Sequence, residues 1–121
     1  MPVITVTSKQ QFDQLIRDTD SVAIQASAAW CGPCKAISPL FEKHSDALAA
    51  DHAVAFAKFD IDQVPDLAQE LGVTSVPTFY FFSQAERTSV VTGANPGSLK
   101  TAVDDLTKRA TGTAFSTTEN F

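Results

Sequence analysis

The sequence predicts a single α/β domain, with a β-sheet between helices. Short β-branched or apolar runs alternate with helical patterns along the chain. One of these runs, SVAIQAS at residues 21–27, is mostly apolar on both faces, which is typical of a central strand. The 121 residues have the length of one domain, and a hydrophobic fraction of 44% is enough to form an ordinary core.

The chain is expected to begin with a strand and a helix that precede this central strand. VITV at residues 3–6 is a short β-branched strand. Ser8 and Gln11 then match an S-x-x-Q capping box, which opens a helix. The apolar face of this helix consists of Phe12, Leu15 and Ile16.

A longer helix and a third strand follow the central strand. The helix extends to about residue 49, and its apolar positions are Ile37, Leu40, Phe41 and Leu48. Pro39 lies inside this helix and is expected to kink it, because proline removes one backbone hydrogen bond and crowds the preceding turn. AVAFAKFDI at residues 53–61 alternates as a strand.

The C-terminal half is expected to add a short helix, two strands and a last helix. Pro65 marks the start of the short helix and Gly72 its end. The strands are PTFYFF at residues 77–82 and TSVVTG at residues 88–93. The last helix begins near Pro96, and its apolar face consists of Leu99, Ala102, Val103 and Leu106. The predicted order is therefore β-α-β-α-β-α-β-β-α.

The last residues differ in pattern from the rest of the chain. Residues 111–121, TGTAFSTTENF, have no hydrophobic period and few charges. We therefore expect a domain at residues 1–110 and a frayed C-terminal tail at residues 111–121. The alternative is that Phe115 and Phe121 pack on the body of the domain.

The charge and the apolar runs exclude several classes of partner. The chain carries 14 acidic and 9 basic residues, a formal net charge of −5, which argues against nucleic acids and anionic membranes. No apolar run has the length needed to span a bilayer. The N-terminal MPVITVTSKQ lacks the basic start and apolar core of a signal peptide, so we expect a cytoplasmic protein.

Both cysteines of the chain lie in one short motif, WCGPCK. Cys31 comes between a buried strand and a helix, so the N–H groups and the positive dipole end of that helix favour its thiolate. Gly32 and Pro33 suit the tight first turn, where the missing N–H of proline costs nothing. Cys34 lies one turn into the helix, near enough to form a disulfide with Cys31. The spacing suits reversible thiol–disulfide exchange.

A structural or metal-binding pair is the alternative interpretation of the two cysteines. One C-x-x-C motif without a second pair of ligands is a poor zinc site, and we expect no bound metal. His44 and His52 lie too far along the chain for a standard finger, and solvated positions are expected for both. Asp60 and Asp62 are interpreted as a solvated turn rather than a metal or catalytic pair.

The motif WCGPCK resembles the active site of the thioredoxin family, and the resemblance extends over residues 3–109. The other matching features are Pro39 in the active-site helix, KFDID (58–62), GVTSVPTF (72–79) and GANPGSL (93–99). The resemblance implies the thioredoxin fold, a central mixed β-sheet with helices on both faces. It also implies that Val76–Pro77 is a cis peptide whose proline faces the disulfide.

The resemblance implies a protein disulfide reductase. Cys31 would attack a client disulfide as a thiolate, and Cys34 would resolve the mixed disulfide, which leaves a redox-active Cys31–Cys34 disulfide. Pro33 between the cysteines is typical of reductants in this family. No prosthetic group is expected, and NADPH would be used indirectly, through a flavin-dependent thioredoxin reductase. The expected partners are that reductase and disulfide-containing client proteins.

The family also implies a substrate groove. Its rim would consist of Trp30, Gly32, Val76, Pro77, Gly93 and Ala94. We expect a monomer, and a weak dimer through the exposed Trp30 is the alternative. Like Gly32 and Pro33, the residues Gln25, Lys58 and Pro77 are expected to support the active site.

Gln25 departs from the family pattern, in which a buried aspartate precedes the first cysteine by six residues. That aspartate acts through water as the proton acceptor for the second cysteine, and an amide cannot take up a proton. Gln25 therefore makes the resolving step by Cys34 the uncertain one. Lys58 loses its partner and is expected to extend to solvent or to turn to Asp60. A binding module with slow redox chemistry is the alternative function.

Overall fold

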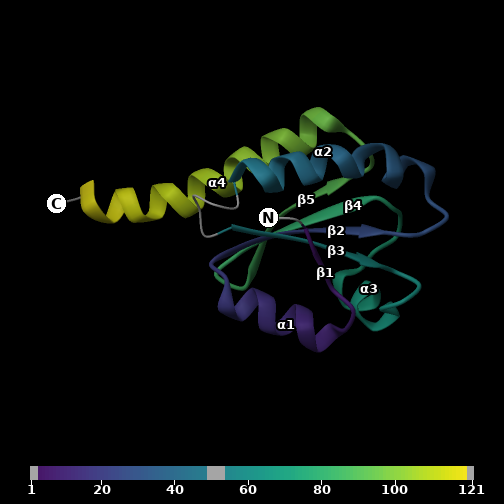
Figure 1. Ribbon diagram of the computed structural model, residues 1–121. Coiled ribbons are helices and arrows are strands. Elements are labelled where there is room, and N and C mark those ends of the chain that lie inside the picture. Colours follow the sequence, from purple (N-terminus) through teal and green to yellow (C-terminus); the bar gives the residue numbers. More distant parts are fainter. Residues whose placement is uncertain (1–2, 49–53, 120–121) are drawn as a thin grey trace.

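The computed structural model (Figure 1) describes residues 3–48 and 54–119, with side chains described as far as residue 109. The elements are β1 Ile4–Thr5, α1 Lys9–Asp18, β2 Ser21–Ser27, α2 Gly32–Leu48, β3 Val54–Asp60, α3 Pro65–Leu71, β4 Thr78–Ser83, β5 Glu86–Thr92 and α4 Pro96–Glu119. This is the predicted order of strands and helices. The predictions for residues 49 and 53 lie outside the described residues.

The five strands form one mixed sheet in the order β1-β3-β2-β4-β5. β3 pairs in parallel with β1 and β2, whereas β4 is antiparallel to both β2 and β5. β2 is thus the central strand, and its first six residues are fully buried. The prediction from the apolar pattern of residues 21–27 is confirmed.

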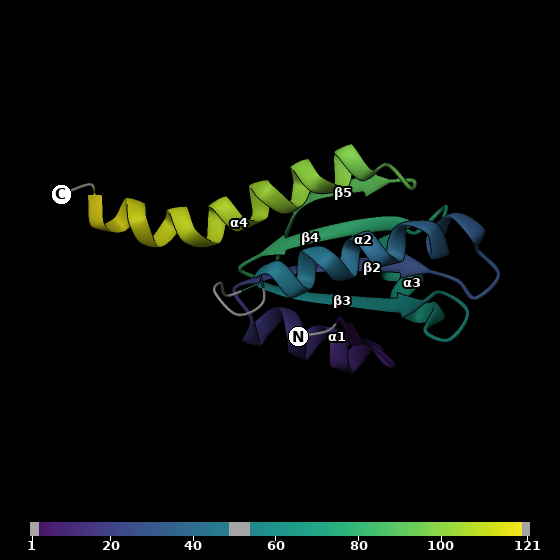
Figure 2. The same ribbon diagram turned by 45° about the horizontal axis from the view of Figure 1, so that its top comes forward.

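Helices cover both faces of this sheet (Figures 1 and 2), which makes three layers. α1 and α3 lie on one face, where Phe12 and Leu67 pack against Ile24 and Phe59. α2 and α4 lie on the other face. There the buried cluster consists of Ala23, Ile37, Phe41, Val54, Phe56, Phe79, Phe81, Leu99, Ala102, Val103 and Leu106. The active-site helix α2 is therefore anchored on the sheet by its apolar side.

The ends of the two helices on the first face follow from local chemistry. The Ser8 hydroxyl accepts a hydrogen bond from the Gln11 N–H at 3.1 Å, as the predicted cap requires. The side-chain Oε1 of Gln11 accepts from the Thr7 N–H at 2.8 Å, so the reciprocal bond of the capping box goes to the residue before the cap. Pro65 begins α3, and Gly72 ends it in the left-handed region at φ 75°.

Helix α4 extends further than the sequence pattern predicts. It continues to Glu119, so it includes most of residues 111–121, and its C-terminal part projects past the sheet (Figures 1 and 2). This segment contains no proline, so the backbone hydrogen bonds of the helix can continue where the hydrophobic period stops. The predicted packing of Phe115 and Phe121 falls outside the described side chains.

Candidate active site

Cys31 and Cys34 form a disulfide where β2 leads into α2. Their Cα atoms are 5.3 Å apart, and each residue is 3% exposed. The Cys34 N–H donates to the Cys31 sulfur at 3.1 Å, and the Lys35 N–H donates to the Cys31 carbonyl at 3.3 Å. The first turn of α2 thus directs at the Cys31 sulfur an N–H that has no partner within the helix, which favours a thiolate there.

The residues predicted to form the groove rim come from three segments: the start of α2 with the loop before it, the loop before β4 and the loop after β5. Val76 packs against the two cysteines, and the Val76–Pro77 peptide is cis, as the resemblance implied. The Gly93 N–H donates to the Pro77 carbonyl at 2.8 Å, which holds the next loop beside the proline. Ala94 is exposed at that loop. We call Trp30, Val76, Pro77, Gly93 and Ala94 the outer rim.

Trp30 is the most exposed part of the outer rim, with 68% of its surface accessible. Its indole N–H donates to the Asp62 carboxylate at 2.9 Å. The Asp60 carboxylate accepts from the Ala29 N–H at 3.1 Å and from the Asp62 N–H at 2.7 Å. The two aspartates, interpreted from sequence as a solvated turn, therefore hold the loop that presents Trp30. Only the sheet register, which brings β3 beside β2, reveals this role.

Gln25 lies under α2, on the inner side of the disulfide, and is 1% exposed. Its side-chain NH2 donates to the Ser38 hydroxyl at 3.2 Å, and the Ser38 hydroxyl donates to the Cys34 carbonyl at 2.7 Å. The predicted burial of Gln25 is confirmed. Ser38 was missed by the sequence analysis, because a serine within a helix gives no signal of its own.

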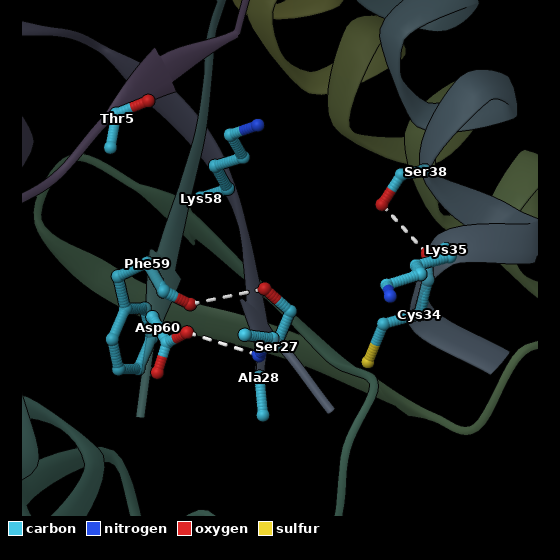
Figure 3. A pocket seen from close by; sticks show the side chains of 10 residues that line it. Thr5, Ser27, Ala28, Cys34, Lys35, Ser38, Lys58, Phe59 and Asp60 are labelled. Carbon is cyan, nitrogen blue, oxygen red and sulfur yellow. Dashed lines mark hydrogen bonds between the residues drawn. The ribbon is translucent and has the colours of Figure 1, made fainter. Parts of the chain in front are cut away.

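A cavity of about 270 Å³ opens beside Cys34 (Figure 3). Its polar and reactive lining consists of Cys34, Lys35 and Ser38 from α2 and Thr5, Ser27, Lys58 and Asp60 from the sheet. Figure 3 shows Cys34 and Ser38 on one side of this space and Lys58 and Ser27 on the other. We call this space the inner cavity. Lys58 does not turn to Asp60: among the described residues, its ammonium group forms no ion pair and no hydrogen bond.

His44 lies on α2 and is partly buried, whereas the sequence predicts a solvated position. The Nε2 atom of His44 is buried and has no hydrogen-bond partner among the residues that the structure describes. Burial lowers the pKa of this imidazole below its ordinary value of 6.5, while Asp104 raises the pKa and Lys100 lowers it. His52 lies outside the described residues. Within the described ranges, no group of three His, Cys, Asp or Glu side chains is placed to hold a metal ion.

Residues 3–105 match the family model described as thioredoxin. The chain belongs to the thioredoxin family. The thioredoxin of Malassezia sympodialis is 43% identical over 101 residues, which are 84% of this chain and 95% of that protein. Thioredoxin-like protein 1 of Schizosaccharomyces pombe is 42% identical over 113 residues. That match includes 93% of this chain but spans 39% of the longer relative.

Solved structures of the family have the same fold. The crystal structure of Malassezia sympodialis thioredoxin has a TM-score of 0.82 at 41% identity, and the alignment covers 88% of this chain and 95% of that chain. Oxidised mitochondrial thioredoxin 3 of Saccharomyces cerevisiae has a TM-score of 0.80 at 36% identity, with 86% and 95% covered. The predicted thioredoxin fold is therefore confirmed.

Family membership and the intact cysteine pair support a thioredoxin-type protein disulfide reductase, an oxidoreductase with disulfide-containing clients. They do not favour the alternative of a binding module with slow redox chemistry. No helix in the described part of the chain is long and apolar enough to cross a membrane.

Proposed function

We propose that Cys31 is the nucleophile and Cys34 the resolving residue of a dithiol that reduces client disulfides. The observation that carries this assignment is the hydrogen bond from the Cys34 N–H to the Cys31 sulfur at 3.1 Å. The sulfur of Cys34 receives no such backbone bond among the described contacts, so the helix N-terminus favours a thiolate at Cys31. Cys31 also precedes Gly32 and Pro33, which are both exposed, and a client can approach along them.

The reaction transfers two electrons from the dithiol to the client. The Cys31 thiolate attacks one sulfur of the client disulfide, and the other client sulfur leaves as a thiolate. The Cys34 thiol loses its proton and attacks the Cys31 sulfur, so the bond between Cys31 and the client breaks. The client then holds two thiols and this chain holds the Cys31–Cys34 disulfide, which is the state in the structure.

The outer rim is the proposed client site. Trp30, Val76 and Ala94 offer apolar surface, and the backbone of Val76 is the proposed pairing site for an extended segment of the client. Gly32 and Pro33 complete the surface beside the nucleophile. The proposed regenerating partner is a flavin-dependent thioredoxin reductase that uses NADPH. The proposed location is the cytoplasm, and the proposed state is a monomer without a bound cofactor.

A coupled assay tests this function directly. NADPH consumption is measured with a thioredoxin reductase, insulin as the disulfide substrate and catalytic amounts of this chain. We expect turnover with the wild type and none with the Cys31→Ser variant. Failure of the wild type to turn over, when the chain is folded and its dithiol is reduced by a chemical thiol, would contradict the proposed function.

A further inference from the structure

A hollow smaller than the inner cavity lies between α2 and the loop that leads into α4. Its volume is about 110 Å³, and its lining residues are all apolar: Ala36, Ile37, Leu40, Ala94 and Pro96. We call it the apolar hollow. Because Ala94 also belongs to the outer rim, the apolar hollow continues the proposed client site.

The α2 wall of the apolar hollow lies on a helix face that begins beside the nucleophile. Residues three and four positions apart share one face of a helix. Pro33, Ala36 and Leu40 follow this spacing, and Pro33 is exposed two residues after Cys31. A client must reach Cys31 to be reduced, so the helix face that it approaches along Pro33 leads to the apolar hollow.

Both walls of the apolar hollow are held by the fold. Ile37 is buried in the core cluster that joins α2 and α4 to the sheet. The loop wall is fixed at its two ends. The Gly93 N–H donates to the Pro77 carbonyl at 2.8 Å, and the Ser98 N–H donates to the side-chain oxygen of Asn95 at 3.0 Å. A site that is already formed loses less free energy on binding than one that must first be ordered.

Size and distance indicate what the apolar hollow can bind. An apolar cavity of about 150 Å³ holds a benzene molecule, so one of about 110 Å³ suits a smaller aliphatic group, such as the side chain of leucine. Ile37 follows Cys31 by six residues, which corresponds to about 9 Å along a helix axis. An extended client advances about 3.3 Å per residue, so a side chain about three residues from the client cysteine can reach the apolar hollow.

We propose that the apolar hollow is a specificity site that binds one aliphatic side chain of an extended client, about three residues from the cysteine that Cys31 attacks. This inference rests on the proposed function. Binding removes apolar surface of the client and of the apolar hollow from water, which favours clients with such a side chain. The apolar hollow thus selects among clients, while the two cysteines perform the same reaction on all of them.

Short peptides with one cysteine in a glycine–serine background provide the test. The cysteine is coupled to nitrothiobenzoate in a mixed disulfide. The Cys31 thiolate attacks the peptide sulfur, coloured nitrothiobenzoate leaves as a thiolate, and Cys34 then displaces the peptide thiol. The second-order rate constant for colour release by the reduced chain is compared for peptides with leucine, alanine or aspartate at the second, third or fourth residue on either side of the cysteine.

We expect leucine to raise this rate constant about fivefold over alanine at one of these positions, and aspartate to give no increase, because an aliphatic side chain leaves water there. Ala36→Leu fills the apolar hollow, so the preference for leucine falls below about twofold, while the alanine peptide reacts within about twofold of the wild-type rate. Leu40→Ala enlarges the apolar hollow and is expected to move the preference from leucine to phenylalanine.

The matched control is Ala47→Leu. It adds the same side chain at another exposed position of α2, about three turns further along the same face and outside the apolar hollow. We expect this variant to keep the wild-type preference for leucine. If Ala36→Leu does not fold, Ala36→Met is measured in its place, and the same outcomes decide.

Three results would overturn the inference while the proposed function stands. They are no preference for leucine in the wild type, an unchanged preference in Ala36→Leu, and an equal loss of preference in Ala47→Leu. Self-association of the wild type in sedimentation, abolished by Ala36→Leu and kept by Ala47→Leu, would assign the apolar hollow to a second copy of the chain instead. Failure of the reduced wild type to release colour from any of the peptides would contradict the proposed function itself.

Discussion

The two sides of the disulfide differ in almost every physical respect. The outer rim is largely apolar, and it ranges from Trp30, which is 68% exposed, to the buried Pro77. On the other side, Ser38, Lys58 and Asp60 bring polar groups to the inner cavity, and the buried amide of Gln25 donates to the Ser38 hydroxyl. The outer rim thus offers apolar surface to a client, whereas the inner cavity brings polar and charged side chains beside Cys34.

This difference separates the two steps of the reaction between two sets of residues. Attack on the client depends on the helix N-terminus at Cys31 and on the outer rim, and resolution depends on the inner cavity. Substitutions on one side are therefore expected to change one step and leave the other. The predictions below test this separation, beginning with the largest effect.

The largest effect is expected from the cysteines themselves. Cys31→Ser leaves a hydroxyl that is not ionised at neutral pH, so insulin reduction falls by at least about a thousandfold, which corresponds to about 4 kcal/mol. Cys34→Ser keeps the nucleophile and loses the resolving thiol. We expect it to accumulate mixed disulfides with clients in a reduced cell extract, detected as reducible bands on non-reducing gels.

The double variant Cys31→Ser, Cys34→Ser is the control for these bands. Mixed disulfides that form with Cys31→Ser but not with Cys34→Ser would reverse the assignment of the nucleophile. That outcome would also place the client on the inner cavity, against the comparison drawn from exposure and polarity.

The second effect concerns stability on the inner side. Gln25→Asp places a carboxyl group in a site that is 1% exposed, and it removes the NH2 donor to Ser38. We expect the free energy of unfolding of the oxidised protein to fall by about 2 kcal/mol at neutral pH, because burial opposes the charge. Denaturant unfolding followed by the fluorescence of the single tryptophan measures this change.

Gln25→Asn is the matched control, since it shortens the side chain equally without adding a charge. Burial raises the pKa of an aspartate above its ordinary value of about 3.9, so the folded state binds a proton more tightly than the unfolded state does. The deficit of the Asp variant relative to Asn is therefore full at neutral pH and disappears as the pH falls below about 4. Equal stability of the two variants at neutral pH would contradict the burial cost.

The sequence allowed most of the fold to be predicted, because periodicity reports burial directly. The main misjudged strand boundary is the start of β5, at Glu86 rather than residue 88. Gln84 and Ala85 form the turn before it with positive φ values of 53° and 66°. Such turns are normally marked by glycine or asparagine, and this pair of residues carries no turn signal. The extension of α4 to Glu119 could not be predicted either, because residues 111–119 have no apolar period to detect.

The site could be predicted only as far as its chemistry is local in sequence. Cys31 and Cys34 are found from spacing, and burial of Gln25 follows from its strand. The role of Ser38 depends on the hydrogen bond that it accepts from Gln25 of the neighbouring strand after folding. The role of Asp62 depends in the same way on the hydrogen bond from the Trp30 indole. Lys58 was expected to extend to solvent or turn to Asp60, but the backbone amides of Ala29 and Asp62 already occupy that carboxylate.

A smaller effect is expected on the outer rim. Trp30→Ala removes an exposed apolar side chain next to the nucleophile, so we expect KM for insulin to rise about fivefold, about 1 kcal/mol, with kcat within about twofold. Asp62→Ala removes the acceptor of the indole N–H and is expected to raise KM about twofold.

Val90→Ala is the control for the outer rim, because Val90 is 43% exposed on β5 and forms no part of the rim. Its KM is expected to match that of the wild type. A similar rise in KM for Val90→Ala would indicate that clients bind exposed apolar surface in general, and the outer rim would lose its special role.

The smallest effect comes from His44, in the second half of α2. Burial of its imidazole lowers the pKa in the folded state below 6.5, so the unfolded state binds the proton first as the pH falls. The free energy of unfolding is therefore full above pH 6.5 and decreases as the pH falls below it. Because the side chain is partly solvated and Asp104 opposes the shift, we expect a loss of a few tenths of a kcal/mol.

His44→Gln removes this titration, so the slope of stability against pH between about pH 7 and about pH 5 becomes shallower than in the wild type. An unchanged slope would mean that His44 titrates alike in both states.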